Sequence, residues 1–156
     1  MSIRCVKKVL RTCLVDPRAV ATDGKGNIYI LERSGNALRV VDRSGKIRTI
    51  AGTGKSGSTG DGGDAKAATF NGPKHLCVDS EGNVFIADTE NHRVRMFRAS
   101  DGTIHNVAGT GAKGGAGLGG PAVRAELAQP HGVLIGPQGV LYISDSSNGR
   151  IVKMSP

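Results

Sequence analysis

Residues 51–63 read AGTGKSGSTGDGG, and residues 108–120 read AGTGAKGGAGLGG. The Gly-Lys-Ser at 54–56 matches the end of a phosphate-binding loop, G-x-x-x-x-G-K-[ST], but Thr49 occupies the position of the first glycine. The second copy has Ala-Lys where the first has Lys-Ser. A nucleotide site has no reason to recur with its phosphate-binding residues replaced, whereas a connection between repeated units does. The two stretches therefore predict an internal repeat.

Three repeated units can be aligned with few gaps. The first runs from Asp16 through GKGNIYILE, the second from Gly72 through SEGNVFIAD, and the third from Gln129 through PQGVLYISD. Each unit holds short apolar runs, rich in β-branched and aromatic residues and bounded by Gly, Asn or Asp, which predict strands. Four strands fit in a unit, and in the second they are expected at about 75–78, 84–87, 93–97 and 104–108. A repeated four-stranded antiparallel sheet of this size predicts a β-propeller blade.

Two of these segments carry a more specific pattern. GDGGDAKAATFNGPKHLCVDSEGNVFIADTENHRVRMF (residues 60–97) resembles an NHL repeat, and GLGGPAVRAELAQPHGVLIGPQGVLYISDSSNGRIVKM (residues 117–154) shows the same pattern. The resemblance extends over nearly the whole chain from Val15. Unit one departs from it, because Glu32 replaces the aspartate and Ala37 replaces the arginine of the pattern. The resemblance implies an all-β fold, a β-propeller built of NHL-type four-stranded blades.

Composition limits the class of protein. The chain has 156 residues, a net charge of +8, 24 glycines and 3% aromatic residues, which fits one domain with many turns. Its apolar runs are shorter than a membrane span, and its first residues lack the apolar stretch of a signal peptide. Cys5, Cys13 and Cys77 form no zinc spacing and favour a reducing compartment. We therefore expect a soluble protein without a membrane segment, in the cytoplasm rather than secreted.

Three blades leave a propeller open, since propellers have about four to eight. The expected single domain comprises blade one at 15–54, blade two at 70–111 and blade three at 127–156, where the fourth strand is missing. Ile3-Arg4-Cys5-Val6 aligns with the fourth strands of blades one and two. We expect residues 1–9 to complete blade three of a second chain, giving a six-bladed homodimer without exposed edges. The alternative is that the chain is a piece of a longer propeller.

Charged residues recur at the ends of the first two strands of each unit. The pairs are 14 residues apart and centred on the turn, so we expect them to face one another around the mouth of the central channel. Salt bridges at a wet rim explain such pairs without any function. His131 differs, because imidazole can bind a metal or act as a base near neutral pH. The candidate site residues are Arg18 with Glu32, Lys74 with Asp88, His131 with Asp145, and His75 beside Lys74.

The resemblance suggests three functions. Most NHL modules bind a small molecule or a protein, which implies a binding site at the axial funnel. Pro130-His131-Gly132 resembles the zinc-binding segment of the peptidyl-hydroxyglycine amidating lyase, and related lactonase-like propellers bind calcium. The alternative is therefore a hydrolase or lyase in which His131 and Asp145 hold a divalent zinc or calcium ion on the dimer axis. Arg18 or Lys74 would then stabilise the charge that develops on an ester, lactone or phosphoester.

The third function is RNA binding on a basic face. The 21 Lys and Arg residues would supply affinity for a phosphate backbone. Yet the five aromatic residues fall at equivalent strand positions or at strand ends, where they form no stacking platform. A nucleic-acid partner is therefore expected less than a small molecule or a protein.

Overall fold

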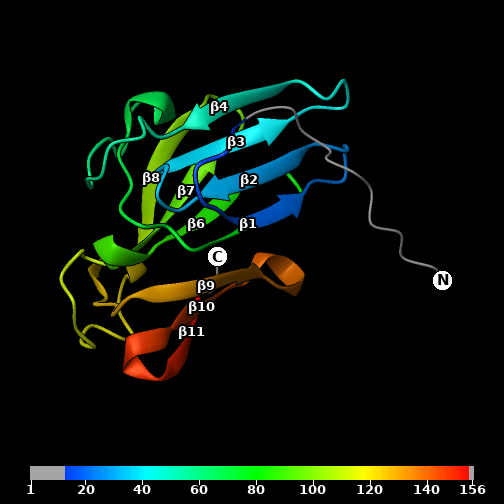
Figure 1. Cartoon of the computed structure of the whole chain (residues 1–156). Helices are drawn as coiled ribbons and strands as arrows, with labels where there is room; N and C mark the ends of the chain where they lie inside the picture. The colour runs from blue at the N-terminus through cyan, green and yellow to red at the C-terminus, as the bar shows by residue number, and fades with distance from the viewer. Residues whose placement is uncertain (1–12, 155–156) are drawn as a thin grey trace, which may run out of the picture.

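The computed structural model describes residues 13–154. Within them lie three antiparallel sheets, each with its strands in chain order (Figure 1). Blade 1 comprises β1 (Pro17–Thr22), β2 (Ile28–Glu32), β3 (Ala37–Val41) and β4 (Ile47–Ala51). Blade 2 comprises β5 (His75–Val78), β6 (Val84–Asp88), β7 (Arg93–Arg98) and β8 (Thr103–Ala108). Blade 3 comprises β9 (Pro130–Ile135), β10 (Leu141–Asp145) and β11 (Arg150–Met154).

Five short 3₁₀ helices join these strands. They are η1 (Ala65–Ala67), η2 (Thr89–Asn91), η3 (Ala122–Arg124), η4 (Pro137–Gly139) and η5 (Ser146–Asn148). The strands expected from the sequence are present, within one residue at each end for blade 2. Residues 1–9, to which the sequence assigns the strand that completes another blade, lie outside the described residues. In residues 13–154, no helix has the length and apolar character needed to cross a membrane.

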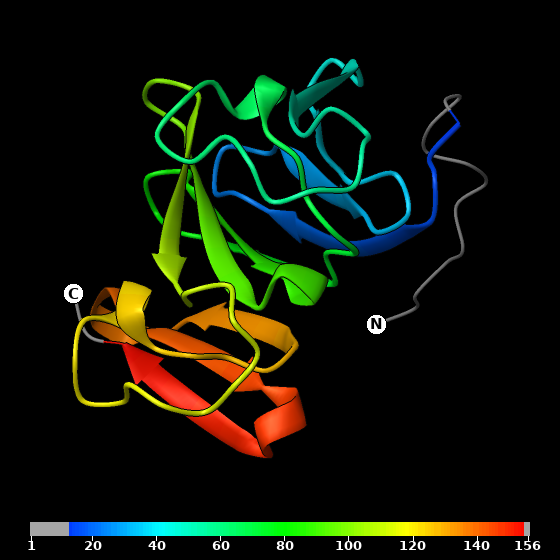
Figure 2. The ribbon, with the colours of Figure 1, turned by 90° about the vertical axis from the view of Figure 1, so that its left-hand side faces the viewer.

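The three sheets are arranged side by side (Figure 2). The first strand of each blade lies next to the first strand of the following blade, so β5 is in contact with β1 on one side and β9 on the other. One apolar core lies between blades 1 and 2 and includes Leu38, Phe70 and Ile104. A second lies between blades 2 and 3 and includes Val94 and Ile143. Burial between successive sheets thus holds the blades together.

The glycine-rich stretch that revealed the repeat is the connection between blades. Gly52 has a φ of 89° and Gly109 a φ of 94°, a region that residues with a Cβ rarely adopt. A Cβ at either position would lie 2.3 to 2.4 Å from a backbone oxygen at the start of the third strand. The amide of Gly52 donates to the carbonyl of Ala65, and that of Gly109 to Ala122. These glycines let the loop turn closely over its blade, and no phosphate is needed to explain them.

Candidate functional site

The first strands of blades 1 and 3 begin with an irregularity in pairing. In blade 1, Pro17 is opposite Glu32 and Ala19 is opposite Leu31, so Arg18 is the extra residue of a β-bulge. In blade 3, Pro130 is opposite Asp145 and Gly132 is opposite Ser144, which leaves His131 as the extra residue. Lys74 holds the equivalent position in blade 2, directly before His75, which pairs with Ala87.

The bulge corrects one expectation. Counting 14 residues across a regular hairpin placed Arg18 opposite Glu32 and His131 opposite Asp145. The extra residue shifts the register by one, so that a proline occupies each of those positions instead. Because a one-residue shift turns a side chain to the other face, Arg18 and His131 do not face Glu32 and Asp145.

The basic residues gather instead with one another, across blades. Lys74 Nζ lies 2.7 Å from His131 Nε2, and it lies 3.7 Å from Glu90 Oε1. Lys74 can only donate, so Nε2 of His131 accepts and the imidazole is neutral, with its proton on Nδ1. Burial lowers the pKa of His131, and the charges of Lys74 and Arg18 lower it further, while Glu90 acts in the opposite direction. We call Arg18, Lys74 and His131 the axial basic cluster.

The carboxylates of Glu32, Asp88 and Asp145 accept hydrogen bonds from backbone amides. Each accepts a hydrogen bond from the amide three residues before the bulge position: Glu32 Oε1 from Val15 at 2.9 Å, Asp88 Oδ1 from Asn71 at 2.8 Å and Asp145 Oδ1 from Ala128 at 2.6 Å. All three side chains are buried. They fix the segment by which the chain joins its innermost strand.

The second oxygen of each aspartate is also occupied. Asn91 donates to Asp88 Oδ2 at 2.8 Å, and Asn148 donates to Asp145 Oδ2 at the same distance. Arg150 Nε donates to Asp145 Oδ2 as well, at 2.8 Å. Burial raises the pKa of Asp88 to about 6, against the lowering effect of these hydrogen bonds and of Arg95. Asp88 and Asp145 thus have little capacity left for a metal ion or a substrate.

Within one chain, the two residues expected to hold a metal ion, His131 and Asp145, are engaged with other groups. Residues 13–154 contain no cluster of three or more His, Cys, Asp or Glu side chains arranged to hold a metal ion. His131 directs Nε2 at an ammonium group, while Asp145 is engaged inside its blade. A divalent ion at these two residues would have to displace Lys74 and the hydrogen bonds of Asp145.

His75 and Cys77 lie outside the cluster. Nδ1 of His75 accepts from the amide of Val133 at 3.3 Å, so this histidine joins β5 to β9. Burial raises the pKa of Cys77 to about 11, which keeps its thiol protonated and poorly nucleophilic. Neither side chain shares the environment of His131, so neither is part of the candidate site.

Arg95 on β7 is a buried arginine that was not among the residues expected to be functional. Its guanidinium donates to Asp61 Oδ1 at 2.9 Å and to the carbonyls of Thr69 at 2.7 Å and Thr59 at 3.0 Å. It also lies 3.7 Å from Asp88 Oδ2. The aligned repeats contained the signal, because both members of the Asp61–Arg95 pair become apolar 57 residues later, as Leu118 and Val152.

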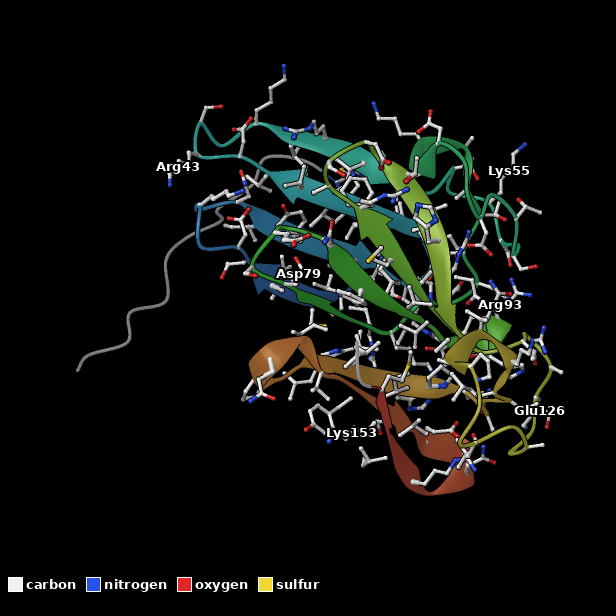
Figure 3. All side chains as sticks on the ribbon, turned by 180° about the vertical axis from the view of Figure 1, so that it is seen from behind. Arg43, Lys55, Asp79, Arg93, Glu126 and Lys153 are labelled. Carbon is white, nitrogen blue, oxygen red and sulfur yellow. The ribbon has the colours of Figure 1, made fainter. Side chains whose placement is uncertain are left out.

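Figure 3 shows the two ends of the blades. Arg93 and Glu126 lie at the end that carries the long interblade loops, and Arg43 and Asp79 lie at the other. The strand registers place Ala51, where the first loop starts, at the same end as Pro17 and the bulge of Arg18. The loops and the axial basic cluster therefore share one end of the molecule.

The family model of the NHL repeat matches residues 70–97 and 127–154. The chain contains NHL repeats. NHL repeat-containing protein 2 of Bos taurus is 33% identical over 94 residues, a match covering 58% of this chain and 13% of the relative. The NHL-repeat chain thus spans a small part of that relative. The family model matches blades 2 and 3, and blade 1 is the unit whose sequence departs from the pattern.

Solved structures share the fold of the NHL-repeat chain. A Bacteroides thetaiotaomicron protein of unknown function has a TM-score of 0.72 at 20% identity, covering 82% of this chain and 32% of its own. A streptogramin B lyase has a TM-score of 0.62 at 15% identity, covering 94% of this chain and 39% of its own. These likenesses show a propeller-like all-β fold. Each neighbour is more than twice as long as the part it shares with this chain.

Proposed function

We propose that this chain forms half of a six-bladed NHL propeller and binds an anionic group at the axial basic cluster. The observation that carries the proposal is the 2.7 Å contact between Lys74 and His131 at the start of adjacent first strands, with Arg18 at the equivalent position of blade 1 and its charge acting on His131. A β-bulge re-aims a side chain without disturbing the rest of the strand. The ligand we propose is a small molecule or a protein segment that presents a phosphate or carboxylate group.

The chemistry of the cluster supports an anion rather than a cation. Lys74 and Arg18 are positively charged near neutral pH, and phosphate and carboxylate oxygens accept charge-assisted hydrogen bonds from such groups. His131 faces the ammonium group of Lys74, which donates to its Nε2, and burial and the nearby positive charges lower its pKa. An anion placed between Lys74 and His131 would oppose that lowering, so His131 would gain a proton and become a further donor. Binding should therefore strengthen as the pH falls through the pKa of His131.

The metal-dependent hydrolase remains the alternative proposal. It is supported by His131 at the axial end of its strand and by the fold shared with lyases, and it requires ligands from a second chain. The engaged carboxylates weigh against it. RNA binding on a basic face gains no further support from the described residues.

The test uses inorganic phosphate as the probe and the imidazole proton resonances of His131 as the readout. In the full chain, phosphate should raise the pKa of His131, whereas sodium chloride at matched ionic strength should not. Lys74→Met should raise that pKa without any ligand and weaken phosphate binding by about tenfold, as expected for loss of one charge-assisted hydrogen bond. Lys25→Met, in the β1–β2 turn at the far end, is the matched control.

Two results would overturn the proposal: a His131 pKa that phosphate leaves unchanged, or equal phosphate affinity in wild type and Lys74→Met. A stoichiometric zinc or calcium ion in the purified protein, lost in His131→Ala, would favour the hydrolase instead.

A further inference from the structure

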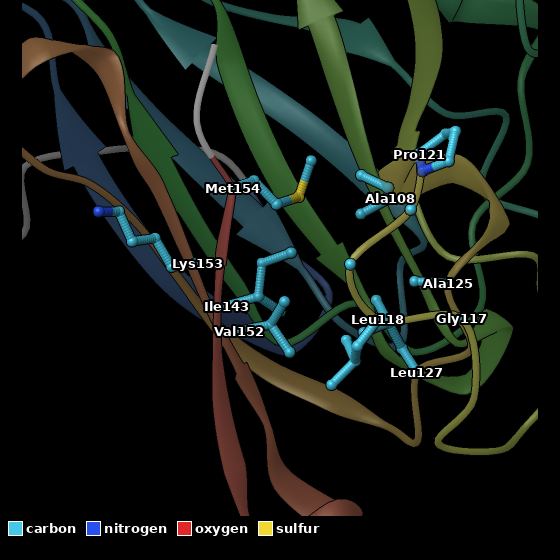
Figure 4. Close-up of a pocket in the computed structure, with 13 residues that line it drawn as sticks. Ala108, Gly117, Leu118, Pro121, Ala125, Leu127, Ile143, Val152, Lys153 and Met154 are labelled. Carbon is cyan, nitrogen blue, oxygen red and sulfur yellow. The ribbon is translucent and has the colours of Figure 1, made fainter.

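A cavity of about 370 Å³ lies beside β11, between blade 3 and the loop that precedes it. Its walls are Ile143, Val152 and Met154 on the blade side, with Gly117, Leu118 and Leu127 on the loop side. Figure 4 shows Ile143, Val152 and Met154 facing this loop across the open space. Within residues 13–154, β11 is the last strand of its sheet.

The same place in blade 2 is filled by Ile104, on the fourth strand β8. Ile104 is fully buried and packs in the core that contains Phe70, Ile86 and Phe97. Adding 57 to these three numbers gives Leu127, Ile143 and Met154, which all line the cavity. The cavity is therefore the site that a residue equivalent to Ile104 would fill.

The loop around the cavity also has glycines at the positions that bind the fourth strand in blade 2. In blade 2 the amide of Gly62 donates to the carbonyl of Ile104 at 2.7 Å, and the amide of Ile104 donates to Gly63 at 3.1 Å. The equivalents, Gly119 and Gly120, line the cavity of blade 3. An added strand would thus find partners on the loop and along the outer edge of β11, which is how an extended segment binds an exposed sheet edge.

The two outer faces of the chain indicate which molecule supplies that strand. Val20 on β1 is 66% exposed, whereas its equivalent in blade 2, Leu76, is 2% exposed because it packs on blade 1. Ile151 on β11 is 67% exposed, whereas its equivalent Val94 is fully buried between blades 2 and 3. Each outer face thus carries apolar side chains that a neighbouring blade covers elsewhere in the chain. Blades 1 and 3 of one chain do not cover one another.

Chain order then selects the segment. A fourth strand always belongs to the blade on which the next blade in the chain is packed, as β8 belongs to blade 2 while β9 to β11 pack on it. The segment before blade 1 must therefore join the blade that covers Val20. Ile3-Arg4-Cys5-Val6 has the pattern of Ile104-His105-Asn106-Val107, with isoleucine at the position that fills the cavity.

We propose that the cavity of blade 3 receives Ile3 of a second copy of this chain, whose blade 1 covers the face around Ile151. This inference rests on the proposed half-propeller and specifies how it closes. By analogy with blade 2, where Arg95 pairs with Asn106 and Phe97 with Ile104, the register places Cys5 opposite Val152 and Ile3 opposite Met154. Two such exchanges around a twofold axis would complete both open sheets.

The register allows a crosslinking test. Directly opposite residues of antiparallel strands have Cα atoms about 4.5 to 5.5 Å apart, within the range that a disulfide spans. Full-length Val152→Cys, mildly oxidised, should form a bond with Cys5 of the second copy and migrate without reductant at about 32 kDa, twice the 16.1 kDa of one chain. Val152→Cys with Cys5→Ser should not crosslink. Lys153→Cys, whose side chain points to the other face of β11, should not either.

A second variant tests the cavity itself. Ile3→Asp would place a carboxylate among apolar walls and should convert the dimer to monomer, whereas Arg4→Asp, at the outward position, should leave it intact in light scattering. A dimer that neither crosslinks nor responds to Ile3→Asp would overturn the strand assignment while leaving the half-propeller standing. A crosslink within one chain would exclude the second copy, and a wild-type monomer at micromolar concentration would overturn the ring as well. Phosphate binding at the axial cluster is measured separately from all of these.

Discussion

Blades 2 and 3 carry equivalent residues 57 positions apart and differ in what covers their outer edge. In blade 2, β8 seals the edge and Ile104 is fully buried. In blade 3 the equivalent space is a cavity open beside β11. The sequence differs at the same place, because Asp61 and Arg95 of blade 2 are replaced by Leu118 and Val152 in blade 3. Blade 2, whose fourth strand comes from its own chain, uses an ion pair of a buried arginine, while blade 3, for which we propose a strand from a second copy, presents an apolar surface.

Under the proposed strand exchange, this difference has a thermodynamic reason. A strand that arrives from another molecule must bring its own free energy of association, and burying apolar surface supplies about 25 cal/mol per Å² without demanding exact geometry. A buried ion pair stabilises only when its partners are precisely placed, and it is costly when they are not. Blade 2 meets that condition because loop, β7 and β8 fold together in one chain.

The largest expected effect is on Arg95. Arg95→Ala would leave the buried carboxylate of Asp88 without its cationic neighbour at 3.7 Å, Asp61 without its closest partner, and the carbonyl of Thr69 without its donor. Removing one partner of a buried pair typically costs about 3–5 kcal/mol in the free energy of unfolding. Val152→Ala, at the equivalent position of blade 3, should cost about 1 kcal/mol. Urea unfolding followed by circular dichroism measures both, and equal losses would contradict the difference between the blades.

Ile104→Ala would create in blade 2 a cavity equivalent to the one beside β11 in blade 3. It should cost about 2–4 kcal/mol, because a large aliphatic side chain is removed from a fully packed site. The loss should be independent of protein concentration. Ile3→Ala should instead lower the melting temperature more at low than at high protein concentration, because it weakens the association of two chains. Concentration-independent melting in both variants would remove the distinction.

Exchanging the ion pair for the apolar pair sharpens the comparison. Asp61→Leu and Arg95→Val should each destabilise blade 2, whereas the double variant should be more stable than the sum of the two losses predicts. The expected coupling is about 1–3 kcal/mol, as found for residues of one hydrogen-bonded network. A double-mutant cycle in urea measures it. Strict additivity would mean that Asp61 and Arg95 do not act as a unit.

The smallest effect is on the pH dependence of stability. The pKa of Asp88 is raised to about 6 in the fold, so the folded state holds a proton that the unfolded state releases at lower pH. Stability contributed by this group is fully present below the unfolded pKa and is lost as the pH rises through 6. Between pH 5 and 7, wild type should lose about 1 kcal/mol relative to Asp88→Asn. A wild type that gains stability relative to this variant over that range would contradict the assignment.

Much of the fold could be predicted from the sequence, because strand positions depend on local patterns that the three units repeat. The 57-residue offset located β5 to its exact ends and identified the glycine loop as a connection between blades. The site was harder. The bulges at Arg18 and His131 insert a residue without leaving a sequence mark, so counting along a regular hairpin put the wrong residues opposite one another. Arg95 escaped notice because a single arginine within a strand gives no sign of whether it is buried, and its joint change with Asp61 is visible only when two repeats are compared.

The bulge position has a consequence for how such proteins change over evolutionary time. An ordinary strand residue is constrained by the core on one face and by its pairing partner, but the extra residue of a bulge is released from both. Arginine and histidine occupy this position in blades 1 and 3, and lysine stands at the equivalent position of blade 2. Selection can therefore exchange the side chain at each innermost strand almost independently of folding stability, and a ring of such positions lets one scaffold acquire new ligands by single substitutions.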